Sequence, residues 1–321
     1  MKSNYYIALL SLLLFSFFTS CDNSDETLLG NDCIKRSISP NIVGGEIEFA
    51  YAMAIPPQYG HLEKVEVWAS IAGAEGTYLN PNSYYTNSNG ADIGVPVADE
   101  SRLEGNSCIT SFVKDTCAAT LRYFYKIPET ARNQEVSFRF SVTASNGEIQ
   151  SYSMGPYKIS KMDIIKDLLL TTGDKCYLSI ADMKVYSESE ISSTPNLASR
   201  VDLMFGTSTN PIIGAGLFAP SAPEEYKSGI VATPVGAVAD TKIVKAWGVR
   251  DQQLSDLQWA VFVDDVDLIS FSFEQATNFT LQLKAENGIW VETADGKYRA
   301  YLFINKIENN QMTIGMKRYA F

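Results

Sequence analysis

Three aspartates, Asp264, Asp265 and Asp267 in VFVDDVDLI, form the densest group of carboxylates in the sequence. Carboxylate oxygens are the ligands that Ca²⁺ prefers, so these residues are weak calcium candidates. The EF-hand order, with Asp first and Gly sixth, is absent. If the segment is a strand, Asp265 and Asp267 share one face and Asp264 points to the other, which favours solvated acids at a strand end or turn. We therefore predict no metal site and no cofactor.

Nucleophilic catalysis of the Ser-His-Asp or Cys-His kind needs a histidine beside the nucleophile. The chain has one histidine, His61, which follows the turn-like stretch PPQYG and is expected to be a solvated loop residue. Neither GxSxG nor the phosphate-binding GxxxxGK[ST] occurs. A glycosidase needs two carboxylates roughly 5–10 Å apart, and the sequence alone selects no such pair. We expect a protein that is not an enzyme and keep a glycan-processing enzyme as an alternative.

Tyr84 and Tyr85 lie in LNPNSYYTNSNGADIG, among Asn and Ser and without hydrophobic neighbours to bury them. An exposed aromatic face stacks on the C–H groups of a sugar ring, and neighbouring amides meet its hydroxyls. The same composition is typical of adaptable protein-binding loops. The alternative is that the pair folds back over the end of its domain. The two tyrosines are the predicted ligand-binding residues.

Cys21 ends the apolar run LLLFSFFTS and is followed at once by polar residues. Lys2 supplies the positive start, and Thr19-Ser20 the small residues, of a secretory signal peptide. The apolar run is shorter than the about 20 residues of a membrane span. The segment resembles a bacterial lipobox, in which the cysteine is acylated and becomes the new N-terminus, although Phe18 replaces the usual leucine. The alternative is an ordinary signal peptide with a chance cysteine.

These features predict a signal peptide over residues 1–20 and a lipidated tether over 21–43. The stretch DNSDETLLGND is polar, acidic and poor in aromatics, so it is expected to stay extended. It resembles the acidic segment that marks surface export of lipoproteins in Bacteroides-type bacteria. Several acyl chains hold a protein stably to a membrane. We expect an outer-membrane lipoprotein exposed on the cell surface, with the periplasmic face as the alternative.

Four of the five cysteines remain after lipidation, namely Cys33, Cys108, Cys117 and Cys176. An oxidising compartment permits disulfides. Cys108 and Cys117 are close enough in sequence to close one loop, and we predict a disulfide between them. A second pair, Cys33 with Cys176, would tie the tether to the second half of the chain and is left open. No CxxC occurs, which argues against a zinc site.

Several stretches in the first half alternate apolar and polar residues, among them GGEIEFAYAMAI, TLRYFYKI and EVSFRFSVTA. Period-two runs bounded by Gly, Pro and Asn predict antiparallel strands. The turn Asn146-Gly147 after the last run is a strong hairpin signal. We predict an immunoglobulin-like β-sandwich over 44–160, with a long polar loop over 79–106.

A joint near Ser160 begins the second half, where MDIIKDLLL is expected to be a short helix or a final strand. An acidic helical stretch from Ser187 to Ala198 and many later strands, DLISFSF among them, predict a β-rich α+β domain over 161–321. There is no βαβ period. The tryptophans stand mostly in alternating segments, and we expect core positions for Trp68, Trp247, Trp259 and Trp290.

The composition supports this organisation. A chain of 321 residues predicts about two domains. The 17 Tyr and 16 Phe, with many Thr, Val and Ile, favour a mainly β protein. The net charge of −11 argues against nucleic acid and against an anionic lipid surface as partners.

The segments FSVTASNGE, YLSIADMKVYS, RVDLMF and especially WVETADGKYRAYLFINK with MKRY resemble an uncharacterised family of two-domain surface lipoproteins from Bacteroides-type bacteria. The resemblance covers most of the mature chain. It implies an immunoglobulin-like first domain and a carbohydrate-related or adhesin-like role, and it carries over no catalytic residues. We expect a non-catalytic binding module for a glycan or a surface partner. A structural component of an envelope complex is the alternative.

Overall fold

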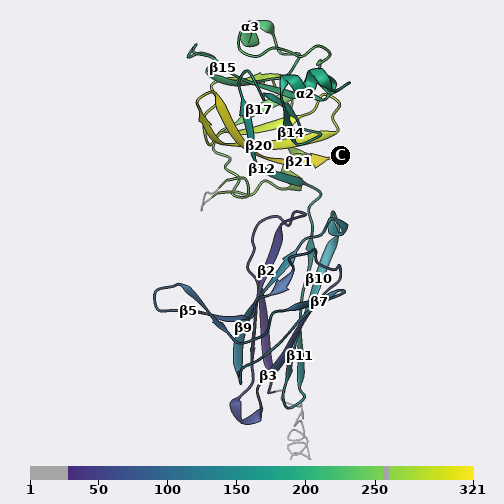
Figure 1. Cartoon of the computed structure of the whole chain (residues 1–321), viewed down its shortest axis with the longest axis vertical. Helices are drawn as coiled ribbons and strands as arrows, with labels where there is room; N and C mark the ends of the chain where they lie inside the picture. Colours follow the sequence, from purple (N-terminus) through teal and green to yellow (C-terminus); the bar gives the residue numbers. More distant parts are fainter. Residues whose placement is uncertain (1–27, 256–259) are drawn as a thin grey trace, which may run out of the picture.

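The computed structural model describes residues 28–255 and 260–321, which form two β-rich domains stacked end to end (Figure 1). The mainly β, two-domain fold predicted from the alternation is confirmed. Among the residues so described, no helix combines the length and the apolar character needed to cross a membrane.

The N-terminal domain is a sandwich of two antiparallel sheets. One sheet consists, in spatial order, of β1 (Gly30–Lys35), β2 (Glu46–Ala54), β9 (Ala118–Lys126) and β4 (Tyr78–Leu79). The other consists of β11 (Ile149–Lys158), β10 (Glu135–Ala144), β3 (Leu62–Ala69), β8 (Ser107–Ser111) and β7 (Arg102–Glu104). A separate hairpin of β5 (Asn82–Thr86) and β6 (Asp92–Pro96) projects from the side of the sandwich (Figure 1). Two short 3₁₀ helices, η2 (Pro57–Tyr59) and η3 (Glu129–Ala131), lie in the connections.

Alternation places the aromatic residues of facing strands in one core. The ring of Phe49 on β2 lies 4.8 Å from that of Phe138 and 5.2 Å from that of Phe140, both on β10. All three side chains are buried. Tilted aromatic pairs at these separations add stability beyond the area that they bury. The two sheets are therefore joined by the side chains that the period-two pattern points inward.

The tether predicted over 21–43 is wrong for residues 30–35. Residues Gly30–Lys35 form β1, an edge strand that pairs antiparallel with β2. Leu29 and Cys33 are buried in the sandwich core. The polar residues Asn31 and Asp32 hide this strand in the sequence, because an edge strand needs only alternate side chains to be apolar.

The C-terminal domain contains two five-stranded sheets. The first consists of β12 (Asp163–Thr171), β21 (Gln311–Ala320), β20 (Tyr298–Glu308), β19 (Gly288–Glu292) and β17 (Lys242–Ala246). The second consists of β14 (Lys184–Tyr186), β13 (Tyr177–Ser179), β15 (Leu203–Thr207), β16 (Ala215–Phe218) and β18 (Phe279–Thr280). Its helices are α2 (Glu188–Ser193), α3 (Glu224–Lys227), α4 (Asp265–Ser270) and the 3₁₀ helix η4 (Ala198–Arg200). The segment MDIIKDLLL is thus a strand, β12.

The strand predicted for DLISFSF is wrong, because its first residues belong to α4. The Asp264 side chain accepts hydrogen bonds from the backbone N–H groups of Val266 and Asp267, and Asp267 reaches back to the backbone N–H of Asp264. Such a capping box satisfies the first free N–H groups of a helix. The start signal was present in the sequence, with Asp in place of the more usual Ser and Glu.

The tryptophans divide between core and surface. Trp290 is buried and stacks on Phe271 with ring centroids 4.4 Å apart. The core positions predicted for Trp68 and Trp247 are wrong, since these side chains are 37% and 73% exposed. Trp68 lies on the outward face of β3, and Trp247 directly follows β17. Trp259 lies outside the described residues.

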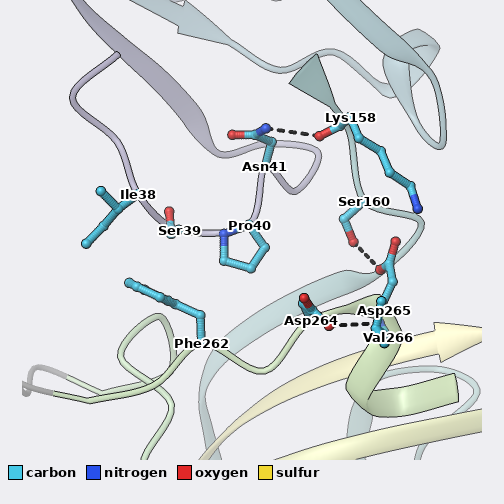
Figure 2. Close-up of a pocket in the computed structure, with 10 residues that line it drawn as sticks. All are labelled: Ile38, Ser39, Pro40, Asn41, Lys158, Ser160, Phe262, Asp264, Asp265 and Val266. Atoms are coloured by element: carbon cyan, nitrogen blue, oxygen red, sulfur yellow. Dashed lines mark hydrogen bonds between the residues drawn. The ribbon is translucent and has the colours of Figure 1, made fainter. Parts of the chain in front are cut away.

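The two domains are tied at the joint by buried polar contacts. Ser160 Oγ donates to Asp265 Oδ1 at 2.5 Å (Figure 2). The backbone N–H of Lys161 donates to Asp265 Oδ2 at 3.2 Å. The guanidinium of Arg132 donates to the carbonyl oxygens of Lys161 and Met162 at 3.0 and 3.1 Å. Ile42, from the N-terminal domain, is buried in the same hydrophobic cluster as residues of the C-terminal domain.

A buried ion pair holds the loop that leads to the joint. Lys317 Nζ on β21 donates to Asp251 Oδ2 at 2.7 Å and to the carbonyl of Val263 at 2.8 Å, and both charged side chains are inaccessible to solvent. The carboxylate of Asp251 also accepts from the backbone N–H groups of Gln253, Leu254 and Val263. Ion pairing and hydrogen bonding of this kind are what make a buried charge tolerable.

Candidate binding groove

A groove of about 590 Å³ runs between the first strands of the N-terminal domain and the projecting hairpin. Three strand segments supply its lining: the start of β1, the end of β2 and the start of β9. The hairpin adds Ser83, Tyr84 and Tyr85. Small residues floor the groove, namely Gly30, Ala52, Ala54, Ala118 and Ala119. The side chains on the floor are small, and the hairpin projects from the sheet. Tyr84 and Tyr85 therefore form a wall of the groove.

Tyr84 is the fixed residue of the hairpin. The guanidinium carbon of Arg122, on β9, lies 4.0 Å from the centroid of the Tyr84 ring, which is a close cation–π contact. On the partner strand, Gly94 is paired with Tyr84, and a Cβ there would lie only 3.1 Å from the ring. Glycine therefore leaves room for this tyrosine to lie against the hairpin and the sheet.

Arg122 also contacts β6, the second strand of the hairpin. Its guanidinium pairs with the carboxylate of Asp92 on β6, and its Nε lies 3.7 Å from Glu48 Oε1 on β2. The pKa of Asp92 is lowered, first by the hydrogen bond from Thr86 and then by Arg122. One arginine thus holds both strands of the hairpin to the sandwich.

Tyr85 points the other way. Successive side chains of a strand point to opposite faces, so Tyr84 and Tyr85 cannot both pack on Arg122. The side chain of Tyr85 is 56% exposed. The sequence left two alternatives open, an exposed ligand-binding pair or a pair folded back on its domain. Each applies to one residue: Tyr84 packs on the sheet, and Tyr85 presents its ring to solvent at the groove.

The strand β1, which lies within the segment predicted as a tether, contributes Asp32 to the groove. The adjacent Asn31 points to the core side of β1, where its Nδ2 donates to the Oη of the buried Tyr51 at 2.8 Å. The carboxylate of Asp32 raises the pKa of Tyr152, through its charge and a hydrogen bond. Alternation of Asp32 and Ile34 about the buried Cys33 was the signal that could have identified this strand.

The three calcium candidates do not form a metal site. Asp264 and Asp267 cap α4, and Asp265 is buried against Ser160. Within the described ranges, no group of three or more His, Cys, Asp or Glu residues is arranged to hold a metal ion. The interpretation of these acids as a solvated strand end is also wrong for Asp265, since its carboxylate is part of the domain joint.

The predicted Cys108–Cys117 disulfide is absent, because both residues are free thiols. Cys108 lies on β8 and points into the core, whereas Cys117 precedes β9 and donates to the carbonyl of Gly60 at 3.6 Å. The two cysteines thus belong to different sheets of the sandwich. The alternative Cys33–Cys176 pair is also absent, since the two residues lie in separate domain cores.

His61 is on the surface, with its Nδ1 3.7 Å from a carboxylate oxygen of the exposed Asp115. Its backbone N–H donates to the hydroxyl oxygen of Ser145 at 3.0 Å. This agrees with the expected solvated loop position. Cys21 lies outside the described residues.

A second hollow, of about 380 Å³, lies at the domain joint (Figure 2). Ile38 and Pro40 come from the N-terminal domain, and Phe262, Asp264 and Val266 from the C-terminal domain. Ile38 is 80% exposed and Val266 is 64% exposed. The joint therefore combines buried polar contacts with an apolar rim.

Comparison with known proteins places this architecture in a family. A domain of unknown function, DUF4466, matches residues 26–159, and a second, DUF8576, matches residues 160–321. A crystal structure of a DUF4466 family protein from Parabacteroides merdae is 50% identical in sequence, with a TM-score of 0.88. The match covers 91% of this chain and 99% of that one.

The chain belongs to the DUF4466 family. The two family models meet between residues 159 and 160, where the chain passes from the N-terminal domain to the C-terminal domain. The comparison with curated proteins gave no match. Because the match to the Parabacteroides structure extends over most of this DUF4466 protein, the two proteins share the two-domain fold.

Proposed function

We propose that this DUF4466 protein is a cell-envelope lipoprotein that binds a glycan without catalysis, through the groove beside the β5–β6 hairpin. The observation that carries the proposal is the different environment of two adjacent tyrosines. Tyr84 is immobilised by Arg122 at 4.0 Å, and Tyr85 offers a 56% exposed ring at the wall of the groove. A ring on a fixed hairpin loses little freedom when a ligand stacks on it.

The rest of the groove suits a sugar. The carboxylate of Asp32 and the hydroxyls of Ser83 and Thr120 belong to residues that line the groove. These groups donate to and accept from sugar hydroxyls. Among the described residues that line the groove, Asp32 is the one carboxylate, whereas glycosidases use a pair. This supports binding rather than hydrolysis.

Membrane attachment belongs to the same proposal. Lipidation at Cys21 puts the protein on the outer membrane, at the cell surface, with the groove in contact with external glycans. The acidic residues that follow Cys21 support surface export. In cells, Cys21→Ser is expected to release the protein from the membrane fraction or leave it unprocessed. Absence of a labelled fatty acid from the wild-type protein would contradict the anchor.

The glycan proposal is tested with residues 21–321, carrying Cys21→Ser so that no lipid is attached. A glycan array identifies a bound sugar, and calorimetry then compares Tyr85→Ala with Tyr85→Phe. We expect Tyr85→Ala to weaken binding by about 1–2 kcal/mol and Tyr85→Phe to retain it, because the ring supplies the contact. The melting temperature should stay unchanged in both. Affinity unaffected by Tyr85→Ala would rule out the groove as the glycan site.

A structural role in an envelope complex is the second candidate function, and the joint favours it. The exposed side chains of Ile38 and Val266 lie on the two sides of the interdomain hollow. Exposed apolar rims of this kind mark protein contacts. If the array shows no bound glycan, Ile38→Asp together with Val266→Asp tests this role by loss of a copurifying envelope partner.

A further inference from the structure

Trp247, on the C-terminal domain, is the most exposed of the described tryptophans, at 73%. It follows β17 directly and precedes Gly248, whose φ of +78° turns the chain away from the sheet. Tryptophan is usually among the well-buried residues on average. Neither the joint nor the groove in the N-terminal domain uses this side chain.

The indole is held from one side. Lys245 Nζ lies 4.3 Å from the ring centroid of Trp247. The same ammonium donates to the carbonyl of Gln282 at 2.9 Å and more weakly to that of Leu281 at 3.4 Å. Backbone carbonyls on a neighbouring segment thus fix the lysine, and the lysine orients the ring. The remaining surface of the indole is open to solvent.

Two lysines near Trp247, Lys245 and Lys284, form no ion pair among the described residues. Lys284 is hydrogen-bonded to Asn287 in the turn that leads directly into Gly288, and Gly288 is paired with Ala246 between Lys245 and Trp247. In agreement with this placement, the pKa of Lys245 is lowered, first by burial and then by the charge of Lys284. In the part of the chain that the structure describes, neither lysine forms an ion pair. The neighbouring basic residues do, with Lys242 Nζ 2.7 Å from Glu292 and Arg250 2.7 Å from Glu286.

Two unneutralised lysines beside an exposed indole are notable on a protein with a net charge of −11. Local complementarity of charge determines which ligands a surface selects. Sugar C–H groups carry partial positive charge and stack on the negative face of an aromatic ring. A carboxylate or sulfate on the same sugar finds its counter-charge in the lysines.

We propose that Trp247, Lys245 and Lys284 form a second binding site, separate from the groove, for an anionic sugar such as a uronic acid or a sulfated hexose. The open face of Trp247 stacks on the sugar ring, Lys284 pairs with the acid group, and Lys245 orients the indole. Lys245 is therefore a positioning residue, since its ammonium is already engaged by carbonyls. The site does not rest on the groove, which lies in the other domain.

A nucleic acid would also stack on tryptophan and pair with lysine. The observations favour a sugar, because an extended polyanion needs a row of cations to neutralise its phosphates. The overall negative charge also repels a polyanion at long range. A single-stranded oligonucleotide is therefore included in the test as an arm expected to show no binding.

The test uses residues 21–321 with Cys21→Ser and calorimetric titration with three probes: oligogalacturonate, its carboxyl-reduced counterpart and chondroitin sulfate oligosaccharides. We expect oligogalacturonate or chondroitin sulfate to bind, and the carboxyl-reduced probe to bind weakly. Trp247→Ala should lower the affinity about tenfold, the loss of one aromatic contact, without changing the melting temperature. Lys284→Ala should abolish the preference for the acidic probe, and Lys284→Arg should restore it.

The controls separate this site from the groove. Trp68→Ala removes another exposed indole, which lies 5.7 Å from the Arg139 guanidinium carbon in the N-terminal domain, and should leave the affinity unchanged. Tyr85→Ala should likewise have no effect on these probes. The proposal is overturned if neither acidic probe binds, if Trp247→Ala binds as well as the wild type, if the carboxyl-reduced probe binds equally, or if the oligonucleotide binds best.

Discussion

Ser160 and Asp265 are 105 positions apart in the sequence, yet their side chains form a buried hydrogen bond of 2.5 Å at the domain joint. Ser160 Oγ also accepts from the backbone N–H of Met162 at 2.9 Å, so the hydroxyl both donates and accepts a hydrogen bond. The contact links the first residues after β11 to the helix α4 of the other domain. It makes the connection between the domains an ordered part of both.

Removing the Ser160 hydroxyl is expected to destabilise the protein. In Ser160→Ala, the Asp265 carboxylate stays buried with one donor fewer, at a cost of about 1–3 kcal/mol in the free energy of unfolding. Urea denaturation followed by tyrosine fluorescence measures this. Ser39→Ala, in the same interdomain hollow, is the matched control. If both variants unfold at the same urea concentration, the Ser160–Asp265 contact does not stabilise the joint.

Breaking the buried Lys317–Asp251 pair should have a larger effect. Lys317→Met leaves the Asp251 carboxylate buried without its cation, and such losses cost about 3–5 kcal/mol. Replacing both residues, by Lys317→Met with Asp251→Asn, removes both charges and should cost less than the single change. Lys306→Met, in the exposed pair with Glu308, is the control and should cost less than about 1 kcal/mol. A double variant less stable than Lys317→Met would contradict this account.

Asp202 gives the C-terminal domain a pH dependence of defined sign. Burial raises the pKa of Asp202 from its ordinary value of 3.8 to about 6, despite hydrogen bonds from the backbone N–H groups of Ile180 and Ala181. Between these two values the folded state binds more protons than the unfolded state. Stability therefore falls as the pH rises from about 4 to about 6, and the penalty is fully present above that range.

Asp202→Asn removes this titration and should flatten the stability profile between the two pKa values. The measurement is urea denaturation at a series of pH values in that range, with the exposed Asp115→Asn as the control. The wild-type protein and the control should show the same slope. A slope unchanged by Asp202→Asn would show that other groups cause it.

The described cysteines are expected to remain thiols. Burial raises the pKa of Cys33 to about 12 and that of Cys176 to about 11, which suppresses the reactive thiolate. Cys117 is the one half-exposed thiol among the described cysteines. Iodoacetamide should therefore alkylate Cys117 first in the native protein, and the others only after unfolding. A Cys108–Cys117 peptide recovered without reductant would contradict the free thiols.

Much of the fold follows from the sequence because strand patterns are local. In EVSFRFSVTA, every second residue from Val136 to Val142 is apolar, and these residues are all buried in the sandwich. The residues that turn the chain, such as Gly147 with its φ of +87°, are equally legible, since few residues adopt that conformation. The class of the fold and the two domains were predictable for this reason.

The tertiary structure decided what these strands place side by side. Asp32 reaches the groove only because β1 pairs with β2, and Tyr84 is fixed only because Arg122 of β9 lies beneath it. Asp265 is buried because Ser160 comes from the other domain. Sequence patterns report which face of a strand is buried, but hydrogen bonds and packing between distant segments choose its neighbours. The candidate sites of this protein lie in those long-range contacts.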